Sequence, residues 1–159
     1  MVTRRKFLGL IGAGGAVLVG GGTVIALLPG EGGTSDGPPR ITYGNESCAR
    51  CGMLIGDARF AAAWRDAGGH ETHFDDIGCM IVKSRETPPA SPARFWVHDF
   101  HTEAWIDAET AAYVQDDSIK SPMAYGLAAA AAPDDARAVA SASLPADWAS
   151  LLKSVKARG

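Results

Sequence analysis

The pattern of hydrophobic and polar positions predicts that the folded part of the chain begins near Ile41. A short apolar run at residues 59–64 and a mixed segment at residues 70–74 flank a glycine turn at residues 67–69. Two short segments joined by such a turn are typical of a β-hairpin. The sequence therefore predicts two paired strands as the first elements of the domain.

A helix and a third strand are predicted to follow the hairpin. Asp75 or Asp76 is a suitable N-cap for a helix over residues 77–85, because a carboxylate there accepts hydrogen bonds from free backbone N–H groups. Residues 95–100 are rich in aromatic and β-branched side chains, which favour a strand. The predicted order is strand, strand, helix, strand.

The second half of the chain repeats this pattern only in part. Residues 102–107 and 111–115 are strand candidates, whereas the alanine-rich residues 127–132 favour helix on intrinsic propensity. A Pro133-Asp-Asp start predicts another helix, and residues 147–156 predict a last short one. No closing strand is evident, so the second repeat of the pattern is incomplete.

The composition divides the chain into three parts. Residues 1–29 hold a basic start and a long uncharged run. Residues 30–40 are rich in Gly and Pro with nothing to bury, which is typical of a flexible linker. Residues 41–159 form the predicted α+β domain, with one unit at about 41–100 and a second at about 101–145.

The N-terminal segment resembles a twin-arginine export signal. Arg4, Arg5 and Lys6 directly precede an uncharged run from Phe7 to Leu28. Its length approaches the roughly 20 residues that span a bilayer, so the segment is either cleaved or kept as a membrane anchor. In both cases the domain is expected outside the cytoplasm. The run contains no cysteine, which excludes a lipid anchor there.

Composition and motifs exclude several classes of function. The 159 residues are 47% hydrophobic and carry a net charge of −3, with Lys and Arg scattered along the chain. Nucleic-acid binding usually needs a basic stripe, so we expect none. The sequence contains no nucleophile elbow, phosphate loop or dinucleotide fingerprint. We therefore expect a protein that is not an enzyme.

The sharpest chemical signal is a set of sulfur-containing residues. Cys48, Cys51 and Cys79 are the three cysteines of the chain, and Met53 follows Cys51 by two residues. Met123 lies in a Ser-Pro-Met turn, where a core methionine is less expected. Thiolate and thioether sulfurs select soft metal ions, Cu(I) above all. The sequence therefore predicts a soft-metal site built from residues that are distant in the chain.

The Cys-x-x-Cys pair leaves three other interpretations open. A structural zinc site would need two more ligands, which Cys79, His70 or His73 could supply. A disulfide between Cys48 and Cys51 would suit an exported protein. A thiol-disulfide oxidoreductase would place the pair at the start of a helix, whereas Gly-Met follows here.

Other polar residues are weaker ligand candidates. On a strand, residues three apart face opposite sides, so neither pair of histidines can chelate one metal without a bend. The histidines are therefore secondary candidates: His70, His73, His98 and His101. Asp75, Asp76 and Asp99 are expected as caps and turn formers, because hard carboxylate oxygen suits Mg or Ca better than Cu(I). Met80 is expected in the hydrophobic core.

Six sequence blocks together resemble the NosL family, the nitrous oxide reductase accessory proteins. The resemblance covers roughly residues 46–142 and depends on the order and spacing of all six blocks. They are Cys48-x2-Cys51-Gly52-Met53, Phe74-Asp75-Asp76-x2-Cys79-Met80, Trp96-Val97-x-Asp99, Trp105-Ile106-Asp107-Ala108, Ala112-Tyr113-Val114 and Ser121-Pro122-Met123.

This resemblance implies an extracytoplasmic Cu(I)-binding metallochaperone. It would deliver copper for the maturation of nitrous oxide reductase, the copper enzyme of denitrification, together with a membrane-bound maturation machinery. The implied fold is two small ββαβ units, in which the segment around Met123 is a strand. The implied ligand candidates are Cys48, Cys51, Met53, Cys79 and Met123.

The chain departs from the family pattern at three points. Many family members are lipoproteins, but this chain has no lipobox cysteine. Ala124 stands where a glycine is usual after the Pro-Met pair. The last strand is replaced by the segment 147–156. We therefore expect the second unit to be incomplete and the localisation to depend on the arginine-led signal.

Overall fold

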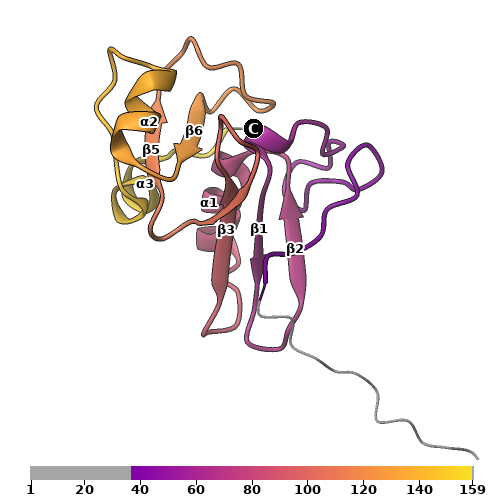
Figure 1. The fold of residues 1–159 in the computed structure, drawn as a ribbon. Helices are drawn as coiled ribbons and strands as arrows, with labels where there is room; N and C mark the ends of the chain where they lie inside the picture. The colour runs from indigo at the N-terminus through magenta and orange to yellow at the C-terminus, as the bar shows by residue number, and fades with distance from the viewer. Residues whose placement is uncertain (1–36, 159) are drawn as a thin grey trace, which may run out of the picture. The chain divides into compact units, whose positions relative to one another are not determined.

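The computed structural model describes residues 37–158 (Figure 1). Four antiparallel strands form the larger sheet, in the order β2-β1-β3-β4. The predicted hairpin is confirmed, because Ala63 of β1 pairs with His73 of β2. The strand bounds are β1 Ala62–Arg65, β2 Glu71–Phe74, β3 Arg94–His98 and β4 Trp105–Asp107. A 3-10 turn, η1 Ala58–Phe60, precedes β1.

Helix α1, Ile77–Glu86, lies behind the larger sheet in Figure 1. Asp76 is its N-cap, and the Asp76 side chain accepts a hydrogen bond from the N–H of Gly78 at 2.8 Å. The helix buries its first six residues, 77–82, in the main hydrophobic cluster. Met80 is among them and is fully buried, as predicted. The order β1-β2-α1-β3, here called the first unit, is a complete ββαβ arrangement.

The smaller sheet contains the one element that intrinsic propensity predicts wrongly. Residues 127–130 form strand β6, Leu127–Ala130, and not a helix. All four residues are buried, and β6 pairs antiparallel with β5, Ala112–Gln115. Pairing with β5 and burial against helix α2, Pro133–Val139, override the high helix propensity of alanine.

The elements β5, β6 and α2, here called the second unit, lack a full closing strand. Ala146 pairs with Tyr113 of β5 through two backbone hydrogen bonds of 2.7 and 2.9 Å. Helix α3, Trp148–Ser154, then follows in place of a longer strand. The prediction of an incomplete second unit and a last helix is therefore confirmed. Trp148, Leu151 and Val155 of this segment are buried, and Leu152 is partly buried.

The segment around Met123 is a turn, which corrects the strand expected from the family resemblance. Residues 121–126 contain two turn positions and no strand, and β6 begins only at Leu127. Tyr125 lies against the start of α1, because a Cβ built on Gly78 would come within 2.1 Å of the Tyr125 ring. The missing side chain of Gly78 thus permits the turn to lie against the helix.

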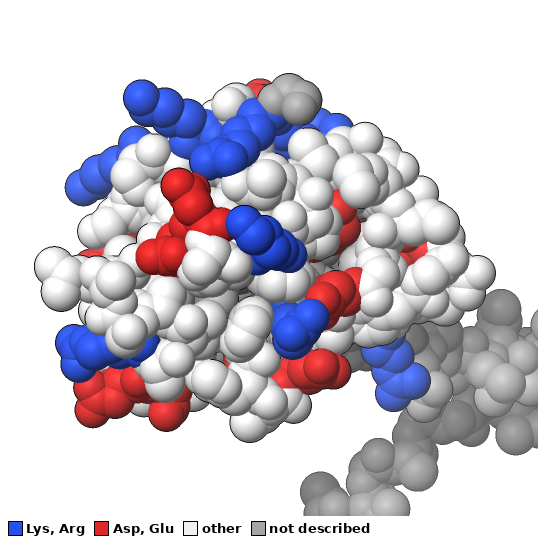
Figure 2. Space-filling model, turned by 90° about the horizontal axis from the view of Figure 1, so that it is seen from above, with Lys and Arg blue, Asp and Glu red and all other residues white. Residues whose placement is uncertain are grey.

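Three further features complete the description of residues 37–158. Among them, no helix is both long and apolar enough to cross a membrane. The predicted signal or anchor at 1–29, and most of the predicted linker at 30–40, fall outside these residues. Figure 2 shows Lys and Arg interspersed with Asp and Glu on one face, apart from a group of basic residues at one edge.

Candidate metal centre

The Cys-x-x-Cys segment forms a tight loop ahead of the first sheet. The N–H of Cys48 donates to the carbonyl of Met53 at 2.8 Å, and the N–H of Gly52 donates back to the carbonyl of Cys48 at 3.0 Å. Gly52 has a φ of 78°, a left-handed conformation that glycine adopts without strain. The N–H of Ala49 donates to the carbonyl of His73 at 2.9 Å, which fixes the loop to β2.

Four potential ligand atoms converge where this loop meets helix α1. Cys48 and Cys51 come from the loop, Asp75 follows β2, and Cys79 lies in the first turn of α1. Their sulfur and carboxylate oxygen atoms all lie within 4.8 Å of one another. Cys48, Asp75 and Cys79 are at most 3% exposed, and Cys51 is partly exposed. We call these four residues the inner cluster, and its three cysteines are free thiols.

The thiols of the inner cluster ionise at very different pH. A hydrogen bond from Cys79, aided by one from Asp75, lowers the pKa of Cys48 to about 4 despite the opposing effect of burial. The same contact with Cys48, together with burial, raises the pKa of Cys79. Burial raises the pKa of Cys51 to about 11. The lowered pKa favours the thiolate form of Cys48, and a bound cation would displace protons from the other thiols.

Asp75 is the cluster member that sequence reasoning missed. Burial and the nearby Cys48 raise the pKa of Asp75 to about 6. The Sγ–H of Cys51 donates to Asp75 Oδ1 at 3.3 Å. Asp76 caps α1 from extended backbone, in which successive side chains point to opposite sides, and the side chain of Asp75 lies with the cysteines and not at the cap. The sequence does contain a signal for this role: Asp75 and Asp76 are adjacent, and a helix needs only one of them as its N-cap.

The two thioether candidates lie on the open side of the inner cluster. Met53, Met123 and Cys51 line one surface cavity of about 420 Å³, together with Arg50, Glu86 and Arg158. Met53 is 47% exposed and Met123 is partly buried. Cys51 thus belongs both to the inner cluster and to this sulfur-lined surface, here called the outer cavity. The structure brings all five sulfur candidates of the sequence to one region.

Asp76 connects the outer cavity to the helix. Asp76 Oδ2 accepts hydrogen bonds from the hydroxyl of Ser121 at 2.7 Å and from the N–H of Met123 at 3.1 Å. The Asp76 side chain is fully buried, and burial raises its pKa. The same carboxylate therefore caps α1 and holds the turn that presents Met123 beside the cysteine loop.

Arg50, between the two loop cysteines, connects the loop to the C-terminal segment. Its guanidinium donates to the carbonyl of Arg158 at 2.9 Å, to Glu86 at 3.2 Å and to the hydroxyl of Tyr125 at 3.3 Å. Burial opposes the charged form of Arg50, but its bond with Glu86 and its charge interactions raise the pKa of the guanidinium. A fixed positive charge next to the thiols offsets part of the negative charge that thiolates would bring.

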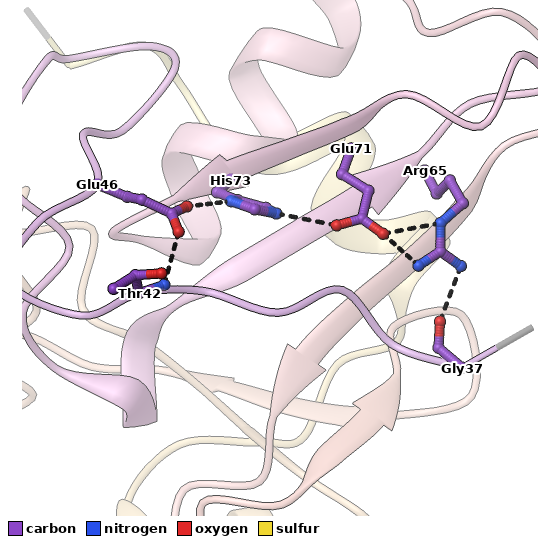
Figure 3. A network of polar contacts seen from close by, with 6 residues as sticks. All are labelled: Gly37, Thr42, Glu46, Arg65, Glu71 and His73. Atoms are coloured by element: carbon purple, nitrogen blue, oxygen red, sulfur yellow. Dashed lines mark hydrogen bonds and ion pairs between the residues drawn. The ribbon is translucent and has the colours of Figure 1, made fainter. Parts of the chain in front are cut away.

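None of the histidines of the chain joins the inner cluster among residues 37–158. His73 lies between Glu46 and Glu71, in the network that continues through Arg65 to the carbonyl of Gly37 (Figure 3). His98 is buried and bonded to Tyr43 and Glu103. His70 pairs with Asp66 on the exposed hairpin turn, and His101 contacts the carbonyl of Asp135. Their roles visible in the structure are local.

Asp99 acts as a turn former, as predicted. Its Oδ1 accepts hydrogen bonds from the N–H groups of His101 and Thr102 at 3.1 and 2.9 Å. Its Oδ2 accepts from the N–H of Ala131 at 2.9 Å, which joins the end of β3 to the end of β6. Asp99 therefore serves the contact between the two units and lies apart from the inner cluster.

The fold and the inner cluster define a small α+β protein with a thiol-rich metal-ligand cluster at the contact of a loop and a helix. The chain belongs to the NosL family, whose family model matches residues 40–143. Its fold is similar to the crystal structure of the copper chaperone NosL from Shewanella denitrificans, with a TM-score of 0.56 and 17% identity, over 70% of this chain and 96% of that one. The chain matches no curated protein.

Proposed function

We propose that the protein is an exported Cu(I) carrier that delivers copper for the maturation of nitrous oxide reductase. The observation that carries the proposal is the outer cavity, where Cys51, Met53 and Met123 face one opening. Thiolate and thioether sulfurs favour Cu(I) over harder ions. The solved relative is itself described as a copper chaperone, which supports the same cargo here.

An open, sulfur-lined site suits a carrier better than a permanent metal centre. Met53 is 47% exposed, so an acceptor ligand can approach a bound Cu(I) from solvent. Transfer by ligand exchange then passes the ion without a naked intermediate. Cys51, between the outer cavity and the inner cluster, is the thiolate ligand, and Met53 and Met123 complete a low-coordinate set.

Titration of the reduced chain with Cu(I) against a competing chelator tests the cargo. One equivalent should bind, and Met53→Leu, Met123→Leu or Cys51→Ser should each weaken binding by about tenfold or more. Met80→Leu is the matched control, because Met80 is fully buried in the core and a Met-to-Leu change conserves volume. Equal binding by all four variants would contradict the proposal.

Delivery and location need separate experiments. Copper-loaded chain should restore activity to copper-free nitrous oxide reductase in the presence of the membrane maturation machinery, and Met123→Leu should slow this transfer. Replacement of Arg4 and Arg5 by Lys should keep the protein in the cytoplasm, which fractionation of cells measures. Unchanged export would argue against a twin-arginine route.

A thiol-disulfide oxidoreductase is the second candidate, because the pKa of Cys48 is lowered to about 4. Such enzymes use a low-pKa thiolate that a substrate can reach. Cys48, however, is only 3% exposed. Turnover of a dithiol substrate by the reduced and oxidised chain distinguishes the two functions, and we expect none.

A further inference from the structure

Basic side chains gather beside the opening of the outer cavity, although the chain as a whole carries a net charge of −3. Lys and Arg are not spread evenly over the surface, and Figure 2 shows a group of them at one edge. Arg50 and Arg158 line the outer cavity. Arg85 donates to the carbonyls of Leu152 and Val155, which holds the end of α1 against the end of α3. We call the residues brought together in this way the basic rim: Arg50, Arg85, Lys153, Lys156 and Arg158.

The fold does not require the two lysines of the basic rim. The carbonyls at the end of a helix need donors or nearby cations, and Arg85 already donates to two carbonyls at the end of α3. Lys153 and Lys156 are exposed, and neither forms an ion pair within residues 37–158. Glu86, the acid that lines the outer cavity, is bonded to Arg50. The basic rim therefore keeps an excess of positive charge.

Two exposed apolar side chains lie next to this charge. Met53 lines the outer cavity and is 47% exposed, and Leu54, the next residue, is 60% exposed. They are two of the four large hydrophobic residues that are exposed among residues 37–158. Copper binding gives Met53 a reason to be exposed, but a leucine side chain binds no metal ion. An apolar centre within a polar rim is the usual arrangement of a protein–protein interface, where Met and Arg are enriched.

The charge and the position of this surface select the partner. A basic rim is complementary to acidic side chains, and complementary charges steer and orient an encounter between proteins. An anionic membrane would attract the same charges, but it would cover the opening through which an accepting ligand must approach the copper. An acidic protein surface that carries its own copper ligands satisfies both requirements.

We propose that Met53, Leu54 and the basic rim form the docking surface for the protein that receives the copper, and that this acceptor carries acidic side chains around its receiving ligands. Docking places the opening of the outer cavity against the acceptor, so that ligand exchange occurs within the complex. The inference rests on the proposed function, because the cargo defines the acceptor.

Transfer of Cu(I) to copper-free nitrous oxide reductase, with its membrane maturation machinery present, tests the basic rim at a series of NaCl concentrations. The rate for the parent chain should fall as salt screens the charges. Lys153→Glu combined with Lys156→Glu should lower the rate at low salt by about tenfold or more and weaken its salt dependence. Arg40→Glu combined with Arg137→Glu is the matched control, because it changes the net charge equally at exposed side chains outside the outer cavity.

The apolar centre is tested in the same assay. Leu54→Gln should lower the rate of transfer by about threefold or more and leave its salt dependence unchanged. Leu144→Gln is the control, since Leu144 is 85% exposed and lies outside the outer cavity. The affinity for Cu(I) against a competing chelator should be the same in all these variants, because every cysteine and methionine is retained.

Two results would overturn the docking surface. One is equal slowing by the lysine and arginine double variants, which would assign the effect to net charge alone. The other is binding of the parent chain to vesicles of phosphatidylcholine and phosphatidylglycerol that the lysine double variant loses, with copper transfer unchanged. That result would assign the basic rim to a membrane.

Failure of the proposed function has a different signature, which is absence of Cu(I) binding by the parent chain in the chelator titration. Docking is then measured as binding of the metal-free chain to the immobilised maturation machinery. The lysine double variant should bind about tenfold more weakly than the parent, and the arginine double variant should bind like the parent. Equal binding by both double variants would overturn the docking surface as well.

Discussion

The two units of the molecule contribute unequally to the candidate site. The first unit and the loop before it supply all three cysteines and Asp75, fixed by the hairpin and by the first turn of α1. The second half of the chain supplies only Met123, from a turn ahead of β6. The first unit thus forms the ligand cluster, and the second unit completes it only if the turn is held against α1.

Because the two units contribute unequally, the position of Met123 depends on the residues that join them. Asp76 bonds to the Met123 turn, Gly78 leaves room for Tyr125, and Arg50 reaches Tyr125 and Arg158. None of these three residues is proposed as a ligand. Substitution of any of the three should therefore reduce the stability of the fold. It should also displace Met123, although every cysteine and methionine is retained.

The largest effect is expected for Asp76→Ala. The change removes the cap of α1 and leaves the buried hydroxyl of Ser121 and the N–H of Met123 without their acceptor. Loss of a cap and of buried hydrogen bonds should together lower the free energy of unfolding by about 3 kcal/mol. Urea denaturation measures the loss.

Two controls separate the roles of Asp76. Asp147→Ala removes the exposed cap of α3, which bonds to the N–H of Ser150, and should cost about 1 kcal/mol. Asp76→Asn keeps an oxygen for the cap but cannot serve all three donors, so its cost should lie between the two. If Asp76→Ala lowers the free energy of unfolding no more than Asp147→Ala does, Asp76 does not hold the Met123 turn against α1.

The sequence predicted the first unit better than the second, for a physical reason. The hairpin, the cap and α1 follow from local signals: a glycine turn and an acid before an apolar run. Strand β6 depends on pairing of its alanines with β5 and on burial by α2, neither of which local propensity contains. Intrinsic propensity therefore predicts helix for residues 127–132, whereas residues 127–130 form β6.

The candidate site shows the same division. The sulfur residues were selected from the sequence by their chemistry, and the structure brings them together. Asp75 was missed because its place in the inner cluster depends on which of two adjacent carboxylates caps the helix. That choice is set by backbone direction at Asp76, where φ is −144° and ψ is 136°. The sequence alone does not contain that direction.

Gly78→Ala should have the next largest effect. Alanine normally stabilises a helix relative to glycine by about 1 kcal/mol. Here the new Cβ would lie 2.1 Å from the Tyr125 ring, so we expect a net loss of about 2 kcal/mol from overpacking. Cu(I) affinity should also fall, because Tyr125 and Met123 share one turn. Gly56→Ala is the control, since its Cβ would meet nothing within 4 Å. Equal stability of the two variants would argue against close contact between the units.

Arg50→Gln should have a smaller effect, of about 1 kcal/mol. The change removes the bonds to Glu86, Tyr125 and the carbonyl of Arg158 from a side chain that is 14% exposed. The matched change Arg59→Gln breaks a local pair with Asp57, at a side chain that is 43% exposed, and should cost less than about 0.5 kcal/mol. Thermal unfolding of both variants measures the difference, and the same loss in both would remove Arg50 from the contact between the units.

The smallest effect expected is a change in the pH dependence of stability, and it concerns His98 of the first unit. The carbonyl of Glu103 can only accept, so His98 Nδ1 carries the proton at 2.7 Å from it, and Nε2 accepts from the hydroxyl of Tyr43 at 2.8 Å. Burial raises the pKa of Tyr43 to about 12, so this hydroxyl stays protonated. The neutral imidazole is therefore satisfied at both nitrogens.

Burial lowers the pKa of His98 below its ordinary value of 6.5. The unfolded chain thus binds a proton at higher pH than the folded chain does, and stability rises with pH between the two pKa values. The contribution of His98 is complete above pH 6.5 and is lost as the pH falls toward the folded pKa. His98→Gln should flatten the slope of unfolding free energy below pH 6.5, whereas the exposed His70→Gln should leave it unchanged. An equal slope in His98→Gln and in the parent would mean that the acid sensitivity does not arise from His98. The raised pKa of Asp76 acts in the opposite direction. A carboxyl that is harder to ionise in the folded chain makes the protein less stable as the pH rises.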